Sequence, residues 1–361
     1  MLTVHNYAVI PQVAAPTTPM VNDTPTVAAP DVVAGGGLLI FATSRRARRR
    51  GRSSGRPGRT RLRLMPSTEF LAFQERMAAN PVPPPPASLQ ELRDRIDAAM
   101  SQIPLAPGTR ADLVDAGGVS AILCTRDDGE DDPWFVYFHG GGFRLASALA
   151  YRAFGTHLAA ACGAQVLLVD YSLAPEHPFP AAINDALTAY QWVLERAVPA
   201  SRIVIGGDSA GGGVTAAMLL ACRDRKLPLP AGGVCLSPWV DLVNNAESYA
   251  KNTSTDKLFS LTSATDASAL YLGDHDRRDP LASPVYGNWG GMPPLLIHVG
   301  SGEVLLDDAA ALAHRARAAG VRVTHEVYRE MPHVWQTNYP AFPEAIDSVD
   351  KIAAFIADVT S

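Results

Sequence analysis

The stretch RIVIGGDSAGGGVTAAMLLACR, from Arg202 to Arg223, decides the fold because it joins three local signals. Its apolar start predicts a buried strand over 202–208, and its alanine- and leucine-rich end predicts a helix over 210–225. Between them, Gly207-Asp-Ser-Ala-Gly211 fits the pattern G-x-S-x-G. In that context the pattern predicts a sharp strand-to-helix turn that exposes the hydroxyl of Ser209.

Two other interpretations of this turn are a phosphate-binding glycine loop and a plain strand–helix connection. The phosphate-binding loop is disfavoured because the stretch lacks the G-x-G-x-x-G spacing and a P-loop lysine. We therefore favour Ser209 as a nucleophile, provided that the rest of the chain supplies its partners.

Strand and helix signals alternate along the chain on both sides of this turn. Strands are predicted over 111–115, 119–125, 133–140, 165–171, 202–208, 231–239, 293–301 and 321–328, and helices over 151–161, 181–196, 210–225, 307–319 and 344–359. Continuous apolar strands that alternate with helices predict an α/β fold, with a mostly parallel sheet covered by helices on both faces.

Two segments depart from this rhythm and are candidates for a cap. Helices are predicted over 67–79 and 88–100, ahead of the first strand, each beginning at a capping serine, Ser67 or Ser88. The alternation also stops between Trp239 and Pro293, a stretch too long for a plain loop. We expect N-terminal cap helices within 65–110, and a main domain over 111–361 with a cap insertion at about 241–292.

The first 64 residues differ in composition from the rest. They hold ten arginines, no lysine and two acids, a charge of +8, whereas 65–361 carries −13. We expect this Arg-rich extension to be disordered; a targeting segment and an over-extended start before Met65 are the alternatives. A secretory signal would place its positive charges before its apolar run, and here the order is reversed. We therefore expect a cytoplasmic protein.

Composition excludes several classes of partner. The acidic main body argues against nucleic-acid binding, and the apolar run before the arginines is too short to span a membrane. Four widely spaced cysteines form neither a zinc-binding pattern nor a disulfide framework. We expect no metal and no cofactor.

A second motif follows the strand predicted at 133–140. It is His139-Gly140-Gly141-Gly142, and HGGG after a strand is typical of the loop that binds the oxyanion in lipases and esterases. Glycines let backbone amides approach a tetrahedral oxyanion closely. The candidate donors are the amides of Gly141, Gly142 and Ala210, and we interpret His139 as a residue that organises the loop.

A base and an acid should follow the serine in the chain. Of nine histidines, His333 is favoured because it lies in a loop after the last strand; His275, His298, His314 and His325 lie in the insertion, in strands or on a helix. For the acid we favour Glu303, directly beyond the penultimate strand. The alternatives are Asp307 and Asp308, which open a helix, where acids commonly serve the helix terminus.

Together these motifs resemble the hormone-sensitive-lipase-like family of α/β-hydrolases over about residues 67–361. The stretches that carry the resemblance are HGGG at 139–142, DYSLAPEHPFP at 170–180, GDSAGG at 207–212, DPLASP at 279–284 and MPHV at 331–334. The resemblance implies an α/β-hydrolase fold with a cap and a Ser209, His333 and Glu303 triad. Two residues depart from the family pattern: most members carry Asp in place of Glu303, and Arg in place of Ser172.

We therefore expect a serine carboxylesterase that hydrolyses small to medium acyl esters in two acyl-transfer steps. A lactone hydrolase or an N- or O-deacetylase would use the same triad and remains an alternative. A non-catalytic receptor on this fold is a further alternative, disfavoured because both the serine and the base are present. The expected partner is a small-molecule ester, and a homodimer is left open.

Overall fold

A computed structural model describes residues 65–80 and 84–361. The Arg-rich segment 1–64, expected to be disordered, lies outside the described residues. The helices are α1 (Thr68–Ala78), α2 (Leu89–Met100), α3 (Arg152–Cys162), α4 (Ala181–Glu195), α5 (Ala210–Asp224), α6 (Glu247–Lys251), α7 (Leu261–Leu272), α8 (Leu306–Ala318) and α9 (Pro343–Thr360), with short 3-10 turns η1 (Ala200–Arg202), η2 (Pro284–Tyr286) and η3 (Trp335–Asn338).

The strands form one eight-stranded sheet. They are β1 (Thr109–Asp115), β2 (Ser120–Arg126), β3 (Trp134–Phe138), β4 (Gln165–Val169), β5 (Ile203–Asp208), β6 (Gly232–Leu236), β7 (Leu295–Gly300) and β8 (Val323–Tyr328), in the order β1-β2-β4-β3-β5-β6-β7-β8. The β1–β2 and β2–β4 pairs are antiparallel, and every other neighbouring pair is parallel. The predicted mostly parallel sheet is confirmed.

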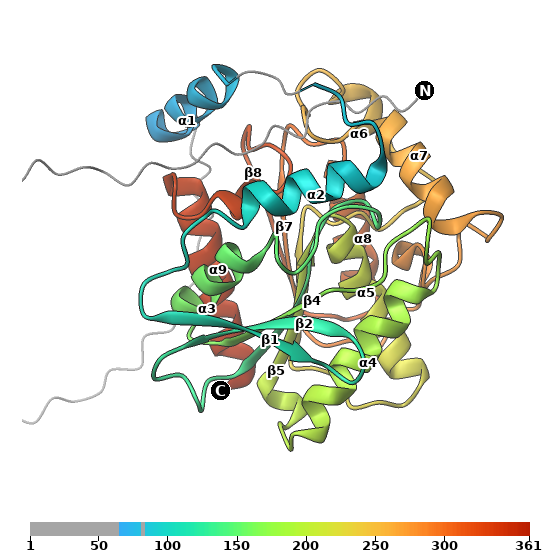
Figure 1. Ribbon diagram of the computed structural model, residues 1–361. Coiled ribbons are helices and arrows are strands. Elements are labelled where there is room, and N and C mark those ends of the chain that lie inside the picture. Colours follow the sequence, from blue (N-terminus) through green and yellow to red (C-terminus); the bar gives the residue numbers. More distant parts are fainter. Residues whose placement is uncertain (1–64, 81–83) are drawn as a thin grey trace, which may run out of the picture. The chain divides into compact units, whose positions relative to one another are not determined.

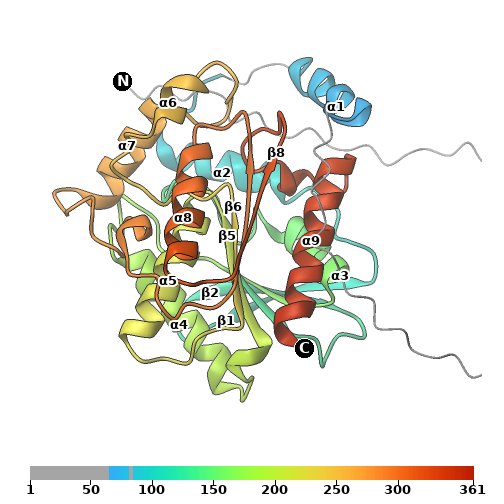
Figure 2. The ribbon, with the colours of Figure 1, turned by 180° about the vertical axis from the view of Figure 1, so that it is seen from behind.

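Helices cover both faces of this sheet (Figures 1 and 2). Successive side chains of β3 point to opposite faces: Val136 belongs to a core that includes α4, α5 and α8, and Tyr137 to a core that includes α3 and α9. Because strands β3 to β7 are buried between two helical layers, they need apolar side chains on both faces, which accounts for their mostly apolar sequence.

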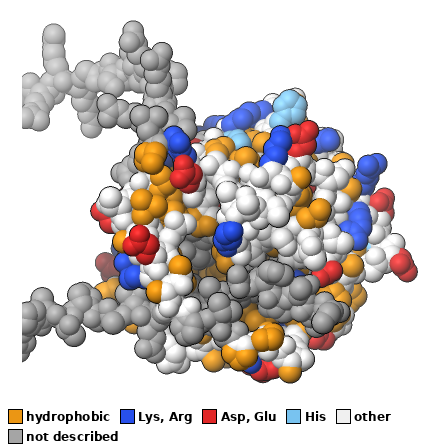
Figure 3. Space-filling model, turned by 90° about the horizontal axis from the view of Figure 1, so that it is seen from above, with side chains coloured by type: hydrophobic (Ala, Val, Ile, Leu, Met, Phe, Trp, Pro, Cys, Tyr) orange, Lys and Arg blue, Asp and Glu red, His pale blue; other side chains and the backbone are white. Residues whose placement is uncertain are grey.

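The segments expected to form a cap contain helices. Helices α1 and α2 precede the sheet, and α6, α7 and η2 lie in the stretch where the strand–helix alternation stops; all four α-helices lie at the top of Figure 1. Figure 3 views that side from above, and on its uncovered part positive and negative side chains are interspersed among neutral and hydrophobic ones. Among the described helices, none is long and apolar enough to cross a bilayer.

Helix α1 is joined to α9 at its N-cap residue, Ser67. The Ser67 hydroxyl accepts from the amide of Phe70, as expected of an N-cap, but no acid stands where a capping box needs one. Glu344 of α9 takes that role: its carboxylate accepts from the Ser67 amide and from the Ser67 hydroxyl, each at 2.7 Å. Sequence spacing alone would not have found this long-range cap.

Three predicted strands, those over 133–140, 165–171 and 231–239, end two or three residues earlier than expected, and two of these ends matter for the candidate site. Strand β3 stops at Phe138, so His139 and its glycines lie in a loop. Strand β6 stops at Leu236 because Ser237 has a left-handed backbone, with φ of 45°, and Pro238 follows it. Polar side chains just past these ends therefore lie at the carboxyl edge of the sheet.

A buried histidine makes the fold sensitive to acid. His298 of β7 is fully buried and its Nδ1 lies 2.8 Å from the Ser348 hydroxyl. Burial lowers the pKa of His298 to about 3, against about 6.5 in an unfolded chain. Between these values the unfolded chain binds a proton that the folded chain does not, so stability decreases as the pH falls from about 6.5 towards 3.

We expect His298→Gln to reduce this acid sensitivity. The free energy of unfolding, measured with urea at about pH 7 and about pH 5, should fall less between the two conditions in the variant than in the wild type. His314→Gln, at an exposed position on α8, should keep the wild-type difference. An unchanged difference in His298→Gln would contradict this account.

Candidate active site

Ser209 lies in a tight turn between β5 and α5. Its backbone has a positive φ of 53° with ψ of −120°, a conformation that residues other than glycine rarely adopt, and its amide donates to the carbonyl of Leu236 at 2.9 Å. A Cβ atom at Gly207 or at Gly211 would collide with the carbonyl oxygen of Phe138 at the end of β3. The two glycines of G-x-S-x-G are therefore required by the close packing of the turn against β3.

His333 bridges Ser209 and Glu303. Its Nε2 lies 2.8 Å from the Ser209 Oγ, and its Nδ1 lies 2.8 Å from the Glu303 Oε2. Ser209 and His333 are 5% and 6% exposed, and Glu303 is fully buried. The structure thus brings together the three residues predicted from the sequence, from the loops after β5, β7 and β8.

The Glu303 carboxylate has two further donors, and neither was predicted from the sequence. The Ser237 hydroxyl donates to Glu303 Oε1 at 2.7 Å, and the Gly300 amide donates to the same oxygen at 2.5 Å. Ser237 also accepts from the amide of Val334, next to the histidine, at 3.3 Å. Ser237 directly follows β6, which lies between the strands that precede Ser209 and Glu303. That position is the sequence signal from which Ser237 could have been identified.

The alternative acids serve the backbone instead. Asp308 accepts from the amides of Val240 and Asp241 through Oδ2, and Asp307 accepts from the amide of Ser248. The alternative histidines also have other surroundings: His275 lies 2.8 Å from Asp279, His298 contacts Ser348, and His314 and His325 lie on α8 and β8.

Charge and burial act in opposite directions on His333. Burial alone would lower the pKa of His333, but the hydrogen bond and charge of Glu303, with the charges of Asp256 and Asp208, outweigh it and raise the pKa above its usual value. Burial raises the pKa of Glu303, against the effect of its hydrogen bonds with His333, Gly300 and Ser237. The site therefore stabilises a protonated imidazole next to Ser209.

The loop that holds His139 and its three glycines is tied to the serine turn by Asp208. This buried carboxylate accepts from the Gly140 amide at 3.1 Å and from the hydroxyls of Tyr137 and Tyr151 at 2.9 and 2.8 Å. Its position immediately before Ser209 means that one residue fixes both the turn and the loop. The pattern G-x-S-x-G leaves this position unspecified, so the motif gives no signal for Asp208.

Three amides near Ser209 are available as donors. Within the described chain, those of Gly141, Gly142 and Ala210 have no acceptor. Gly141 and Gly142 have φ values of 120° and 63°, which other residues rarely adopt.

His139 contacts the loop itself. Its Nδ1–H donates to the carbonyl of Gly140 at 2.7 Å, and its ring stacks on Tyr171 at 4.3 Å. Tyr171 in turn donates from its hydroxyl to the carbonyl of His139 at 2.7 Å. Burial lowers the pKa of His139, so its imidazole is held neutral within the loop.

A segment from the expected cap insertion contacts both Glu303 and His333 or their chain neighbours. Asn252 donates to the carbonyl of Glu303 at 2.7 Å, and Asp256 accepts from the amide of Val304 at 3.0 Å. Three residues further on, the ring of Phe259 stacks on His333 with centroids 5.6 Å apart. The same stretch therefore contacts both partners of Ser209.

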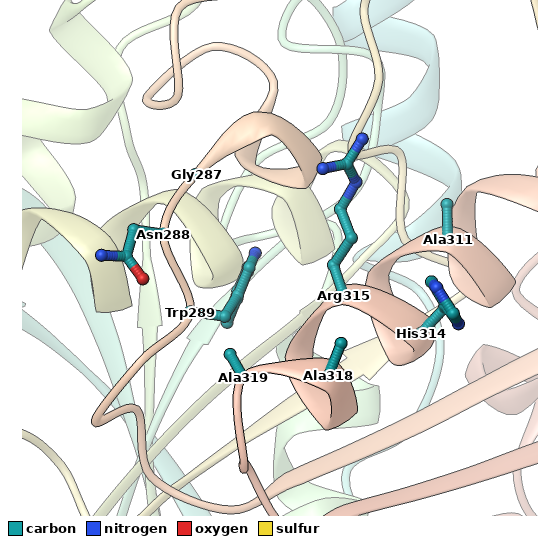
Figure 4. A pocket seen from close by; sticks show the side chains of 8 residues that line it. All are labelled: Gly287, Asn288, Trp289, Ala311, His314, Arg315, Ala318 and Ala319. Atoms are coloured by element: carbon teal, nitrogen blue, oxygen red, sulfur yellow. The ribbon is translucent and has the colours of Figure 1, made fainter.

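A separate hollow of about 690 Å³ lies on the outer side of α8. It is lined by Gly287, Asn288, Trp289, Ala311, His314, Arg315, Ala318 and Ala319 (Figure 4). None of these residues belongs to the group around Ser209, so the hollow carries no part of the candidate chemistry.

Comparison with known proteins agrees with this geometry. A family model described as the alpha/beta hydrolase fold matches residues 135–337, more than half of the chain. A solved esterase of the bacterial hormone-sensitive lipase family is 41% identical with a TM-score of 0.74, and the match covers 79% of this chain and 94% of that one. This chain belongs to the hormone-sensitive-lipase-like family of α/β-hydrolases.

Curated relatives of this family cover most of the same region. An acetyl-hydrolase from Streptomyces hygroscopicus is 40% identical over 269 residues, which are 74% of this chain and 88% of that protein. An esterase from Acinetobacter venetianus is 37% identical over 220 residues, or 61% of this chain and 73% of that protein. The resemblance inferred from the sequence motifs is confirmed.

The buried contact between Glu303 and His333 leads to a test that needs no substrate. We expect Glu303→Gln to lower the pKa of His333, because a neutral amide no longer stabilises the imidazolium. The pKa can be measured by NMR titration of the protein with isotope-labelled histidine. Asp308→Asn is the matched control and should leave the pKa of His333 unchanged; a fall in the control alone would assign the acid to Asp308.

Proposed function

We propose that this chain is a serine carboxylesterase in which Ser209 is the nucleophile, His333 the base and Glu303 the acid. The observation that carries the proposal is the position of the His333 ring, with one nitrogen 2.8 Å from a serine hydroxyl and the other 2.8 Å from a buried carboxylate. This is the arrangement that activates a serine for acyl transfer. The esterases among its relatives support the reaction class.

In the first step the Ser209 oxygen attacks the ester carbonyl carbon while His333 Nε2 accepts the hydroxyl proton. The carbonyl oxygen becomes an oxyanion, and the amides of Gly141, Gly142 and Ala210 donate to it. Collapse of the intermediate breaks the bond to the alcohol, which takes the proton from His333. The products of this step are the free alcohol and an acyl-serine.

In the second step water attacks the acyl-serine and passes a proton to His333. The second tetrahedral intermediate collapses, the proton returns to Ser209, and the carboxylic acid leaves. Glu303 keeps its charge throughout: it fixes the Nδ1–H tautomer and stabilises the imidazolium that forms twice per turnover. All groups in this cycle belong to the chain, the ester or water.

The proposed substrates are esters with small to medium acyl groups. The relative named acetyl-hydrolase, 40% identical to this chain, favours acetyl esters as the first substrates to test. We further propose that the helices within 65–110 and the insertion at about 241–292 form a cap over the site. Contacts of both segments with loops around Ser209 support this arrangement.

Labelling with a fluorophosphonate probe tests the nucleophile. We expect the wild type to be labelled and to hydrolyse p-nitrophenyl acetate and butyrate, and Ser209→Ala to lose the labelling and at least about a thousandfold in kcat. Circular dichroism should show that the variant remains folded. Retention of ester turnover by folded Ser209→Ala would overturn the proposed mechanism.

The additional hydrogen bond to Glu303 gives a second test. We expect Ser237→Ala to lower kcat about tenfold with little change in KM, because a buried carboxylate loses a hydrogen bond of about 1.5 kcal/mol. Ser348→Ala removes another buried serine hydroxyl, one that contacts His298 instead, and should keep kcat within about twofold of the wild type. Equal kcat values for the two variants would contradict a role for Ser237.

A further inference from the structure

Arg93 of α2 makes an unusually complete set of hydrogen bonds with two loops. Its Nε–H donates to the carbonyl of Arg144 at 2.8 Å, and one terminal nitrogen donates to the carbonyl of Ala174, also at 2.8 Å. Both terminal nitrogens donate to the carboxylate of Glu176, at 2.9 and 2.8 Å. A longer contact of 3.5 Å joins Arg93 to Gln90 of the same helix. The flat guanidinium thus binds three acceptors of the two loops at once, in a fork geometry that a lysine ammonium does not offer.

The two carbonyls are the important partners of Arg93. The Glu176 side chain is 52% exposed, so its ion pair with Arg93 is screened by water and weak. The Arg93 side chain itself is only 13% exposed, because it lies between α2 and the two loops. Removing it would leave partly buried carbonyls without a donor, at a larger cost than breaking the ion pair.

Arg144 lies at the outer end of the loop that presents the candidate oxyanion donors. The amides of Arg144 and Leu145 both donate to the carbonyl of Gly141, at 3.2 and 3.0 Å, so residues 141–145 form one closed turn. The carbonyl of Phe143, in the same turn, accepts from the amide of Ala174 at 2.8 Å. Arg93 therefore binds both sides of the junction between these loops.

The inner end of the loop is held separately, where Asp208 accepts from the amide of Gly140. Gly141 and Gly142 lie between these two attachments. Without Arg93 the outer end still has the hydrogen bond between the Ala174 amide and the Phe143 carbonyl, but the Arg144 carbonyl loses its donor. The turn is then held less firmly, so it can rotate slightly and the two amides change direction. Oxyanion stabilisation depends on donors that are already aligned, so such a rotation reduces the rate more than it reduces substrate binding.

We propose that Arg93 is a positioning residue for oxyanion stabilisation, acting from helix α2 by fixing the carbonyls of Arg144 and Ala174. This inference rests on the proposed function, because it concerns the direction of the Gly141 and Gly142 amides during ester hydrolysis. Arg93 itself contacts neither Ser209 nor His333 within the described chain, and so takes no part in proton transfer. Helix α2 thereby affects the rate of ester hydrolysis, although it lies outside the group around Ser209.

The test compares Arg93→Met with Arg95→Met on p-nitrophenyl acetate. Arg95 lies on the same helix, but among the described residues its hydrogen bonds go to Glu91 and the carbonyl of Pro84. Its variant therefore controls for the loss of one arginine from α2. We expect Arg93→Met to lower kcat about 10- to 100-fold and to leave KM within about twofold of the wild type. The upper end of this range equals the smallest decrease in kcat, about 100-fold, that follows the removal of one oxyanion donor. Arg95→Met and Glu176→Gln should keep kcat within about twofold.

A second measurement distinguishes positioning from a general loss of stability. An aryl trifluoromethyl ketone forms a hemiketal oxyanion with an active serine, so its affinity reports the oxyanion donors directly. In Arg93→Met its inhibition constant should rise by the same factor as kcat/KM falls, while the melting temperature and KM change little. Free guanidinium at millimolar concentration should restore part of kcat in Arg93→Met and none in Arg95→Met.

Several outcomes would overturn this inference. They are an unchanged kcat in folded Arg93→Met, a higher KM with unchanged kcat, or an unchanged ketone affinity. If Arg93→Met does not fold, the same measurements are made on Arg93→Lys. A folded lysine variant with wild-type kcat and wild-type affinity for the ketone would also reject the inference. Failure of the proposed function is distinguishable, because the wild type would then show no turnover and no labelling of Ser209.

Discussion

The close packing of the Ser209 turn against the end of β3 is the constraint on which the rest of the site depends. No side chain fits at Gly207 or Gly211, because the carbonyl of Phe138 occupies the space. The loop with the candidate oxyanion donors begins at the next residue after Phe138. One contact between neighbouring parallel strands therefore fixes the distance between the serine and the donors, before any side chain of the site is considered.

Parallel pairing extends the same logic to the other partners. Strands β5, β6 and β7 are adjacent, and β8 pairs with β7, so the residues after their carboxyl ends meet at one edge. Ser209, Ser237, Glu303 and His333 follow these four strands in that order. The sheet brings these four residues to the same edge, and the buried hydrogen bonds between them then orient their side chains.

This is also why so much could be predicted from the sequence. The strand–helix alternation predicted the sheet, and short motifs beside strand ends predicted Ser209, Glu303 and His333, because each signal is local in the chain. Contacts that depend on the tertiary fold were not predictable. Three such contacts are hydrogen bonds between residues far apart in the chain, and none has a distinctive local sequence pattern. They join Ser237 to Glu303, Gly140 to Asp208, and Ser67 to Glu344. Several strands were also predicted to end two or three residues further along the chain than they do. At β6 the strand ends at a residue with positive φ, Ser237, and such a residue has no clear sequence signature unless it is glycine or asparagine.

The hydrogen bonds from the segment around Asn252 and Asp256 to the Glu303 turn have a consequence for how this chain can change. In an enzyme whose cap is a separate module, the cap can be exchanged to alter the range of substrates without disturbing the chemistry. Here the insertion supplies hydrogen bonds to the turn that holds Glu303 and an aromatic ring against His333. A graft at this position would have to preserve those contacts, so substrate range and catalytic competence are expected to evolve together and to resist independent redesign.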